Sequence, residues 1–374
     1  MKAVVRSVLK AALYRALAMA AAAKPGRRPL PDAREARRIL LSEIALMGDV
    51  ASLAPSLAAA RALWPGAHID LLVPAPFAAL FEGDGRADSV LRLRDMGTAS
   101  YVSALLAVRR RRYDLALSMS PGLRNAGVAV LAGAKASAGY LMDTGFPPHH
   151  LNRQSVEGLG VALEPVPDIG PETHIADRGL RVLEALGAEV AGAAQAKLVL
   201  DPGSVSRIES RLASEGILPS GPFAVLHPSA GEHARRWPRG RFVELARRLR
   251  LEEGLGVAWI GGKPDARLLR RIRAHLGEPS VVLTGRRLDE LSVLVRRAAL
   301  FVGNDSGPMH LAGAVGTPLV GIFGPGDPAR LLPRGGPAAA VRAPSRLVAD
   351  VSVDEVLSAV RQVLQIGDGS GDGR

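Results

Sequence analysis

The most constraining feature of this sequence is a strand–helix alternation that runs twice along the chain. In the first half, short and almost wholly apolar runs lie at 39–45, 68–73, 89–93, 113–119 and 137–142. In the second half, similar runs lie at 222–230, 256–262, 280–285, 300–306 and 318–324. Segments with helical periodicity separate the runs of each set. Near-continuous apolar strands that alternate with helices predict parallel sheets covered by helices on both faces.

The alternation therefore predicts an α/β protein with two Rossmann-like domains, at about 37–195 and 196–350. The Pro- and Gly-rich stretch 143–171 interrupts the rhythm, and residues 351–374 are expected to form a C-terminal helix and a disordered tail. A length of 374 residues agrees with two domains, because single cores stop growing at roughly 250–300 residues. Ligands of such folds bind outside the carboxyl ends of the strands, so we expect the two domains to face each other across a cleft.

The composition excludes several classes of site. The chain has no cysteine, which excludes disulfides, thiolate metal sites and cysteine nucleophiles. Its aromatic content is only 4%, and no nucleic-acid reading motif is visible. Surfaces that bind nucleic acids normally combine positive charge with stacking groups or such a motif, so we expect no nucleic-acid partner.

Positive charge is concentrated at the N-terminus, where residues 1–36 are expected to form a basic helix and linker. Ten basic and two acidic side chains give residues 1–38 a charge of +8, out of +12 for the chain. Charges at positions 2, 6, 10 and 15 interrupt every apolar run, so neither a signal peptide nor a membrane span is predicted. Two interpretations remain. The segment is a solvated basic tail, or it lies on an anionic membrane, where each Lys or Arg contributes about 1 kcal/mol.

The segment 303–328 carries the strongest binding signal. A strand ends at Val302, and the sequence N-D-S-G then leads directly into a helix with Pro308 in its first turn. Free backbone N–H groups around Ser306, Gly307 and Met309, with the positive end of the helix dipole behind them, suit an anion such as a diphosphate.

Two further features of this segment bear on the same anion. Gly307 allows a ligand to approach the backbone closely, and His310 lies one turn into the helix. The alternative interpretation is that Asp305 and Ser306 only cap the helix and that His310 is a core residue. The long Gly-rich continuation of the segment favours the anion site.

Three segments together resemble a known family. The segment 303–328, the segment 227–242 (HPSAGEHARRWPRGRF) and the segment 42–73 resemble glycosyltransferase family 9. These are the bacterial heptosyltransferases that build the inner core of lipopolysaccharide. The match runs in order from about Arg37 to about Pro328.

The resemblance implies the two-Rossmann fold of the glycosyltransferase B type and an inverting, metal-independent mechanism without a cofactor. It implies transfer of a heptose or similar sugar from a nucleotide-sugar donor, expected to be ADP-heptose, to a lipopolysaccharide core or another lipid-linked glycan. The N-terminal domain would bind the acceptor and the C-terminal domain the donor. The protein would then be cytoplasmic, and the basic leader would keep it peripheral on the inner face of the cytoplasmic membrane.

The resemblance also implies roles for single residues. Asp49 would be the general base for the acceptor hydroxyl, with Gly48 allowing a tight turn before it; the alternative is that Asp49 caps a helix beginning near Val50. Arg235 stands where family members often carry Lys and would contact the donor phosphates, with Arg236 beside it. The alternative for the two arginines is a solvated pair on a loop.

Three more residues take roles in donor binding. Ser229 would donate its hydroxyl to the same phosphates, and Asp305 would bind hydroxyls of the donor sugar. Asp265 occupies the position of an acidic ribose contact, although it also suits the first turn of a basic helix. The neighbouring Trp237 is expected to be a packing anchor rather than a stacking platform.

Two other signals do not support a site. Gly261 and Gly262 follow a strand but complete no G-x-G-x-x-G motif, so no nicotinamide site is indicated. His149 and His150 are adjacent and have no third ligand at suitable spacing, so no metal site is predicted. Two alternative functions stay open: a nucleotide-sugar hydrolase or epimerase of the same fold, and a sugar-nucleotide-binding protein without turnover.

Overall fold

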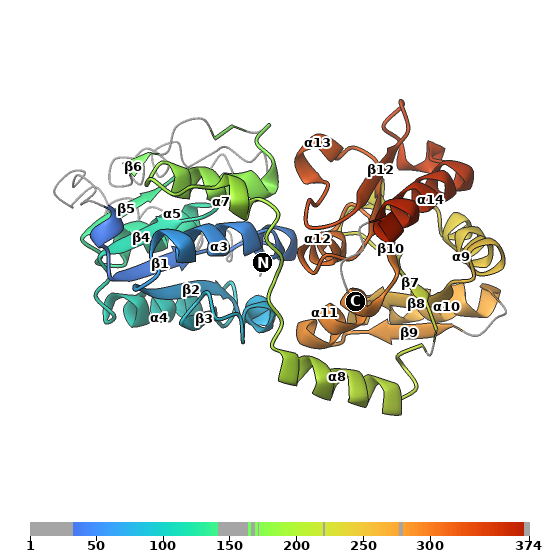
Figure 1. Cartoon of the computed structure of the whole chain (residues 1–374), viewed down its shortest axis with the longest axis horizontal. Coiled ribbons are helices and arrows are strands. Elements are labelled where there is room, and N and C mark those ends of the chain that lie inside the picture. Colours follow the sequence, from blue (N-terminus) through green and yellow to red (C-terminus); the bar gives the residue numbers. More distant parts are fainter. Residues whose placement is uncertain are drawn as a thin grey trace, which may run out of the picture. The chain divides into compact units, whose positions relative to one another are not determined.

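The two sets of strands build two separate α/β units, Met1–Ala194 and Gln195–Arg374, in the computed structural model of the chain (Figure 1). The structure describes residues 33–140, 164–165, 169–170, 172–219, 221–276 and 280–369. Most of the basic leader, the His149–His150 pair and the last five residues lie outside these ranges. In the described part of the chain, no helix is long and apolar enough to cross a membrane.

The first unit contains a six-stranded parallel sheet in the order β3-β2-β1-β4-β5-β6. Its strands are β1 (Arg38–Ser42), β2 (His68–Pro74), β3 (Ser89–Leu93), β4 (Leu115–Ser118), β5 (Ala136–Gly139) and β6 (Glu164–Pro165). The central strand β1 is buried at every position after Arg38, as expected for a strand with helices on both faces. Because the strand order reverses between β1 and β4, the loop after β1 lies at the switch point where such sheets bind ligands.

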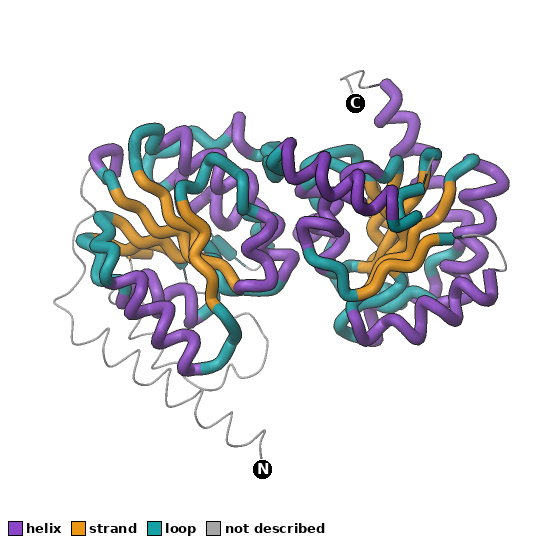
Figure 2. The backbone as a smooth tube through the Cα atoms, turned by 90° about the horizontal axis from the view of Figure 1, so that it is seen from below, coloured by secondary structure: helices purple, strands orange, loops and turns teal. Residues whose placement is uncertain are grey.

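Helices cover both faces of this sheet (Figure 2). They are α2 (Met47–Ala51), α3 (Ala54–Leu63), α4 (Thr98–Arg109), α5 (Leu123–Leu131) and α7 (Ile175–Glu184), with short 3-10 turns η1 (Ala33–Glu35), η2 (Ala75–Leu80) and η4 (Ala191–Ala193). Buried residues of α4 and α5 form a core with β1–β4 on one face, and α7 packs against α3 on the other.

The segment between β1 and β2 forms two helices, which a turn at Ser52 and Leu53 separates. Pro55 lies in the first turn of the second helix, α3, where its missing N–H costs nothing. The first helix, α2, therefore begins earlier than predicted and includes Asp49.

The second unit repeats the same topology, with a parallel sheet in the order β12-β11-β10-β7-β8-β9. Its strands are β7 (Phe223–His227), β8 (Gly256–Gly261), β9 (Val281–Thr284), β10 (Leu300–Asn304), β11 (Leu319–Phe323) and β12 (Ala338–Arg342). The sequence did not indicate β12, because it is an edge strand of small, half-exposed residues. Both units thus have a Rossmann-like sheet.

The helices of the second unit are α8 (Pro202–Ser214), α9 (Arg239–Glu253), α10 (Ala266–Leu276), α11 (Leu288–Arg297), α12 (Gly307–Ala314), α13 (Pro328–Leu331) and α14 (Val353–Gly369), with 3-10 turns η5 (His233–Arg235), η6 (Lys263–Asp265) and η7 (Val348–Asp350). The sequence pattern did not indicate α8, because it is a largely polar helix in which only Ile208 and Leu212 are buried. The C-terminal helix α14 continues three residues into the segment expected to be a disordered tail.

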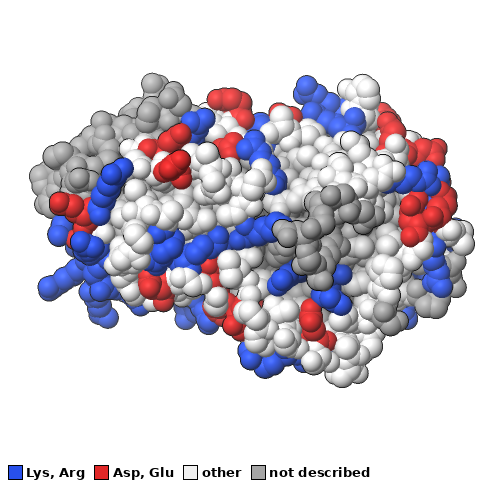
Figure 3. Space-filling view, viewed as in Figure 1, with Lys and Arg blue, Asp and Glu red and all other residues white. Residues whose placement is uncertain are grey.

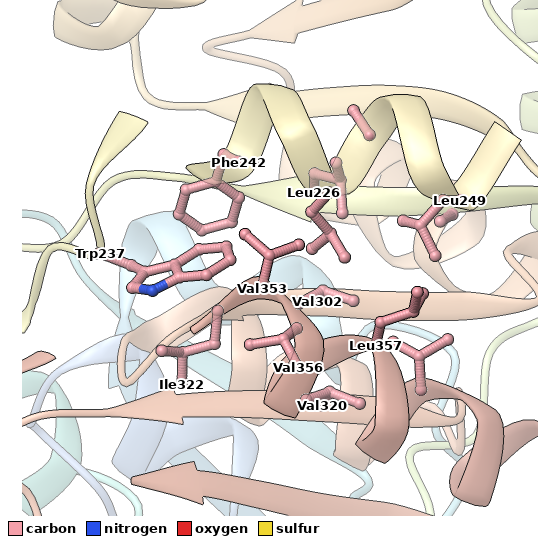
Figure 4. Close-up of a cluster of buried hydrophobic side chains, with 14 of the residues drawn as sticks. Leu226, Trp237, Phe242, Leu249, Val302, Val320, Ile322, Val353, Val356 and Leu357 are labelled. Atoms are coloured by element: carbon pink, nitrogen blue, oxygen red, sulfur yellow. The ribbon is translucent and has the colours of Figure 1, made fainter. Parts of the chain in front are cut away.

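Helices α9, α10 and α14 form the main core of the second unit against the sheet (Figure 4). The prediction that Trp237 is a packing anchor is confirmed: its side chain is 1% exposed, and its indole N–H donates to the Val351 carbonyl at 2.8 Å. The ring also meets Phe242 edge to face, with 4.9 Å between centroids. This packing fixes the loop between β7 and α9, which carries Ser229 and Arg235.

Candidate active site

The loop after β10 leads into α12 as the sequence predicted, with Pro308 in the first helical turn. Ser306 occupies the N-cap position, but its side chain makes no capping hydrogen bond, so the interpretation of Ser306 as only a cap is wrong. Its hydroxyl donates instead to the Asn304 carbonyl at 3.0 Å. The N–H of Met309 donates to the Ser306 carbonyl at 3.0 Å, so the prediction that this N–H is free is also wrong.

His227, the last residue of β7, is a functional candidate that sequence reasoning missed. Its Nδ1 lies 3.1 Å from the Ser306 hydroxyl, and its side chain is buried. Burial lowers the pKa of His227 to about 4, against the opposing effect of Asp265, so the imidazole is neutral at neutral pH. The Ser306 hydroxyl gives its proton to the Asn304 carbonyl, so its oxygen can only accept a hydrogen bond from His227. Both hydrogen bonds are therefore formed when Nδ1 of His227 carries the ring proton. In the sequence, the signal for this residue was the H-P-S-A motif, whose histidine is the last residue of the strand.

Arg235 and Asp305 form an ion pair at 3.2 Å, beside the start of α12. Asp305 is 3% exposed, and its burial raises the pKa of the carboxyl, while the Arg235 cation lowers it and Glu232 raises it again. Gly326 leaves room for this carboxyl, because a Cβ at that position would clash with Asp305 Oδ2. The structure thus brings the expected phosphate contact and the expected sugar contact together.

The neighbouring loop between β7 and α9 supplies further polar groups. Ser229 is 8% exposed, and its hydroxyl has no hydrogen-bond partner among the described residues. Arg235 is ion-paired with Asp305, so the interpretation as a solvated arginine is wrong for this residue. Arg236 is exposed, and its Nε donates to the Ala230 carbonyl at 2.8 Å. The Asn304 side-chain oxygen accepts a hydrogen bond from the backbone N–H of Trp237 at 3.0 Å, which links this loop to β10.

The two remaining donor-side candidates, Asp265 and His310, lie in different surroundings. The Asp265 carboxylate accepts the Gly262 N–H at 2.8 Å and so closes the 3-10 turn η6. Asp265 therefore lies before α10, which begins at Ala266, and not in the first turn of that helix as the alternative interpretation had it. His310 is 6% exposed and lies in α12.

In the first unit, Asp49 lines a small polar cavity at the carboxyl end of the sheet. The cavity measures about 10 Å³, room for about one water molecule, and its other walls include Glu43, Ser56, Tyr140 and Arg178. The N-cap of α2 is Leu46, so the alternative interpretation of Asp49 as the cap is wrong.

Opposing effects act on the carboxyl of Asp49. Burial raises its pKa, whereas the Arg178 cation and backbone hydrogen bonds lower it. Gly48 is buried inside α2, immediately before Asp49, and so belongs to a helical turn rather than to a tight loop.

Glu43 is a second residue that sequence reasoning missed, because it stands inside an apolar run. It follows the last residue of β1 and is 2% exposed. Burial and the neighbouring Asp49 raise the pKa of Glu43 to about 8, against the lowering effects of Ser120, Arg178 and Asn125. An acidic residue at the end of a buried strand was the only signal in the sequence.

Comparisons with known proteins agree on one family. The model of glycosyltransferase family 9 (heptosyltransferase) matches residues 103–353. Lipopolysaccharide heptosyltransferase 3 of Escherichia coli is 25% identical over 292 residues, which are 75% of this chain and 81% of that protein.

Solved structures show the same fold. A family 9 glycosyl transferase from Veillonella parvula superposes with a TM-score of 0.75 at 20% identity, covering 88% of this chain and 97% of that one. The E. coli ADP-heptose lps heptosyltransferase II superposes with a TM-score of 0.71 at 22% identity, covering 88% and 99%. The expected fold, two Rossmann-like domains of the glycosyltransferase B type, is confirmed.

Proposed function

Because this chain belongs to glycosyltransferase family 9, the heptosyltransferases, we propose that it moves a heptose from ADP-heptose to a hydroxyl of a lipopolysaccharide core. A curated relative, lipopolysaccharide heptosyltransferase 3, and a solved relative named for ADP-heptose support this donor and this acceptor. In the proposal, the second unit binds the donor and the first unit binds the acceptor.

The observation that carries the donor assignment is the Arg235–Asp305 pair beside the N-terminus of α12. A guanidinium and helix N–H groups bind a diphosphate, and a neighbouring carboxylate accepts hydrogen bonds from sugar hydroxyls. Additional proposed contacts for the phosphates are the backbone at Gly307, His310 of α12, and the Ser229 hydroxyl, which has no hydrogen-bond partner among the described residues. These groups would neutralise the charge of the leaving ADP without a metal ion.

Asp49 is the proposed general base. It takes the proton of the acceptor hydroxyl as the hydroxyl oxygen forms a bond to the anomeric carbon. The bond from that carbon to the diphosphate oxygen breaks on the opposite side, and ADP leaves with the electron pair, so the anomeric configuration inverts. The burial that raises the pKa of Asp49 makes it a stronger base than an exposed aspartate.

Calorimetry with ADP-, UDP-, GDP- and CDP-linked sugars tests the donor. We expect a preference for ADP-heptose, and we expect Asp305→Ala to weaken the binding at least about tenfold, since it removes charge-assisted hydrogen bonds. Asp350→Ala, an exposed aspartate of the same unit, is the matched control. A preference for another nucleotide, or unchanged binding by Asp305→Ala, would contradict the donor site.

Release of ADP in the presence of truncated lipopolysaccharide core tests the transfer. Asp49→Asn should lower kcat about 10²–10⁴-fold, the usual contribution of a general base, and leave ADP-heptose affinity unchanged. Release of free heptose without acceptor would identify a hydrolase instead.

We also propose that the first unit contacts an anionic membrane surface, where a lipid-linked acceptor lies. Helix α4 supports this within the described residues: Val102 and Leu106 are 42% and 52% exposed, and Arg109 and Arg110 are exposed at its end. Basic side chains gather on the first unit near α4 (Figure 3). Exposed apolar groups bordered by arginines suit the interface of an anionic bilayer.

A further inference from the structure

The proposed reaction leaves one buried acid of the first unit without a role. Glu43 is 2% exposed and lines the same small cavity as Asp49. Its Oε1 atom is buried and has no hydrogen-bond partner among the described residues. A buried carboxyl that is only partly hydrogen-bonded costs free energy unless it is neutral or has a compensating charge.

Among the residues that the structure describes, the groups around this carboxyl include one cation and two acids. Asp49 faces Glu43 from α2, Arg178 faces it from α7, and Tyr140 lies at the end of β5. Burial and the nearby carboxyls raise the pKa of Tyr140, so this phenol stays neutral. Ser120 and Asn125 contribute only neutral hydrogen-bonding groups. Two carboxylates that share the half-buried Arg178 would leave an uncompensated charge, so the pair is most stable when it holds one proton.

The surroundings of the two acids decide which one holds that proton. For Asp49, Arg178 is the strongest of the groups that lower its pKa, and backbone hydrogen bonds act in the same direction. For Glu43, burial and Asp49 dominate and raise its pKa to about 8, and the effect of Arg178 is smaller. Glu43 is also the more deeply buried of the two, because it is 2% exposed whereas Asp49 is half-buried, so the proton belongs on Glu43 at neutral pH.

We infer that Glu43 is a positioning residue that stays protonated beside Asp49, so that Arg178 compensates the charge of the catalytic base alone. This inference rests on the proposed role of Asp49. When Glu43 loses its proton, two anions compete for Arg178 in the buried cavity. Arg178 then no longer holds Asp49 alone, and the rate of transfer falls as pH rises.

The position of the proton is tested without any substrate, by NMR titration of carboxyl groups in protein labelled with ¹³C at Asp and Glu. The Glu43 resonance is identified by its absence in Glu43→Gln. In the wild-type chain it should titrate near pH 8, and in Asp49→Asn its midpoint should fall by about one pH unit or more, because the neighbouring charge is gone. A Glu43 midpoint near its ordinary value of 4.5, or the same midpoint in Asp49→Asn, would overturn the inference.

The functional consequence is tested by the pH profile of ADP release from ADP-heptose with truncated lipopolysaccharide core. Each profile is scaled to its own maximum. The wild-type rate should fall above about pH 8, and Glu43→Gln should lack this alkaline decline because glutamine cannot ionise. Glu82→Gln, an exposed glutamate of the same unit paired with Arg92, is the matched control and should keep the wild-type profile.

The same alkaline decline in Glu43→Gln would refute the positioning role. If the wild-type protein released no ADP from ADP-heptose, the proposed function would fail instead. The NMR titration would still decide which carboxyl holds the proton.

Discussion

Replacing Glu43 with glutamine should change how the stability of the first unit depends on pH. The folded state raises the pKa of Glu43 from 4.5 to about 8. Below pH 4.5 the carboxyl is protonated in both the folded and the unfolded state, so burial of the neutral acid adds no pH-dependent cost. Between pH 4.5 and about 8 the unfolded state loses this proton while the folded state keeps it, and the free energy of unfolding falls as pH rises.

The magnitude follows from the difference in pKa. One pKa unit corresponds to about 1.4 kcal/mol, so a difference of about 3.5 units costs about 5 kcal/mol at pH 8 and above. Between about pH 5 and pH 8 the decline should be about 3.5 kcal/mol. Domains are stable by only about 5–15 kcal/mol, so this effect should be large enough to measure. A glutamine side chain is nearly isosteric with the protonated acid and cannot ionise, so the Glu43→Gln variant should lack the decline.

Hydrogen exchange followed by mass spectrometry measures this effect in the first unit by itself, through peptides of β1 and α3. Stability at a series of pH values should decline in the wild-type chain and in the Glu82→Gln control. The curve for Glu43→Gln should be flatter, with a higher free energy of unfolding at about pH 8. Parallel curves for wild type and Glu43→Gln would refute the reasoning, because they would mean that Glu43 ionises at the same pH in both states.

Three further predictions concern other parts of the chain. Gly326→Ala should push the Asp305 carboxyl away from Arg235 and weaken ADP-heptose binding about tenfold by calorimetry, whereas Gly240→Ala, which has open space around it, should leave the affinity unchanged. Trp237→Ala should lower the stability of the second unit by about 3–5 kcal/mol in urea unfolding, since it removes a buried ring and leaves the Val351 carbonyl without its donor; a loss below about 1 kcal/mol would contradict the packing role. Arg110 and Arg112 are exposed arginines that directly follow α4, and their charge reversal to Glu should weaken sedimentation with anionic vesicles at least about tenfold. The same reversal at the exposed Arg270 and Arg271 of the second unit should have less effect; equal losses would contradict a membrane-facing α4.

Hydrophobic periodicity was sufficient to predict the repeated α/β architecture. The strands at the centre of both sheets lie within the predicted apolar runs or begin one residue before them. Periodicity did not predict β12 or α8, because an edge strand of alanines and a mostly polar helix bury too few apolar side chains to leave a pattern.

The candidate site was also predictable only in part. The N-D-S-G turn and the position of Pro308 were readable in the sequence, because they depend on neighbouring residues of one strand and one helix. The ion pair between Arg235 and Asp305 and the contact between His227 and Ser306 were not readable, since each joins side chains that are about 70 or more residues apart in the chain and that only the folded sheet brings together.

By itself, the sequence determined the two parallel-sheet units, the family and the loops that carry the polar residues, because these follow from local patterns along the chain. Only the tertiary structure decided the environment of Glu43. The sequence shows an acid within an apolar run; the packing of α2 and α7 at the end of β1 surrounds that acid with Asp49 and Arg178 and removes it from water. The charge state of a carboxyl depends on burial and on neighbouring charges, and both are properties of residues far apart in the chain that fold into contact.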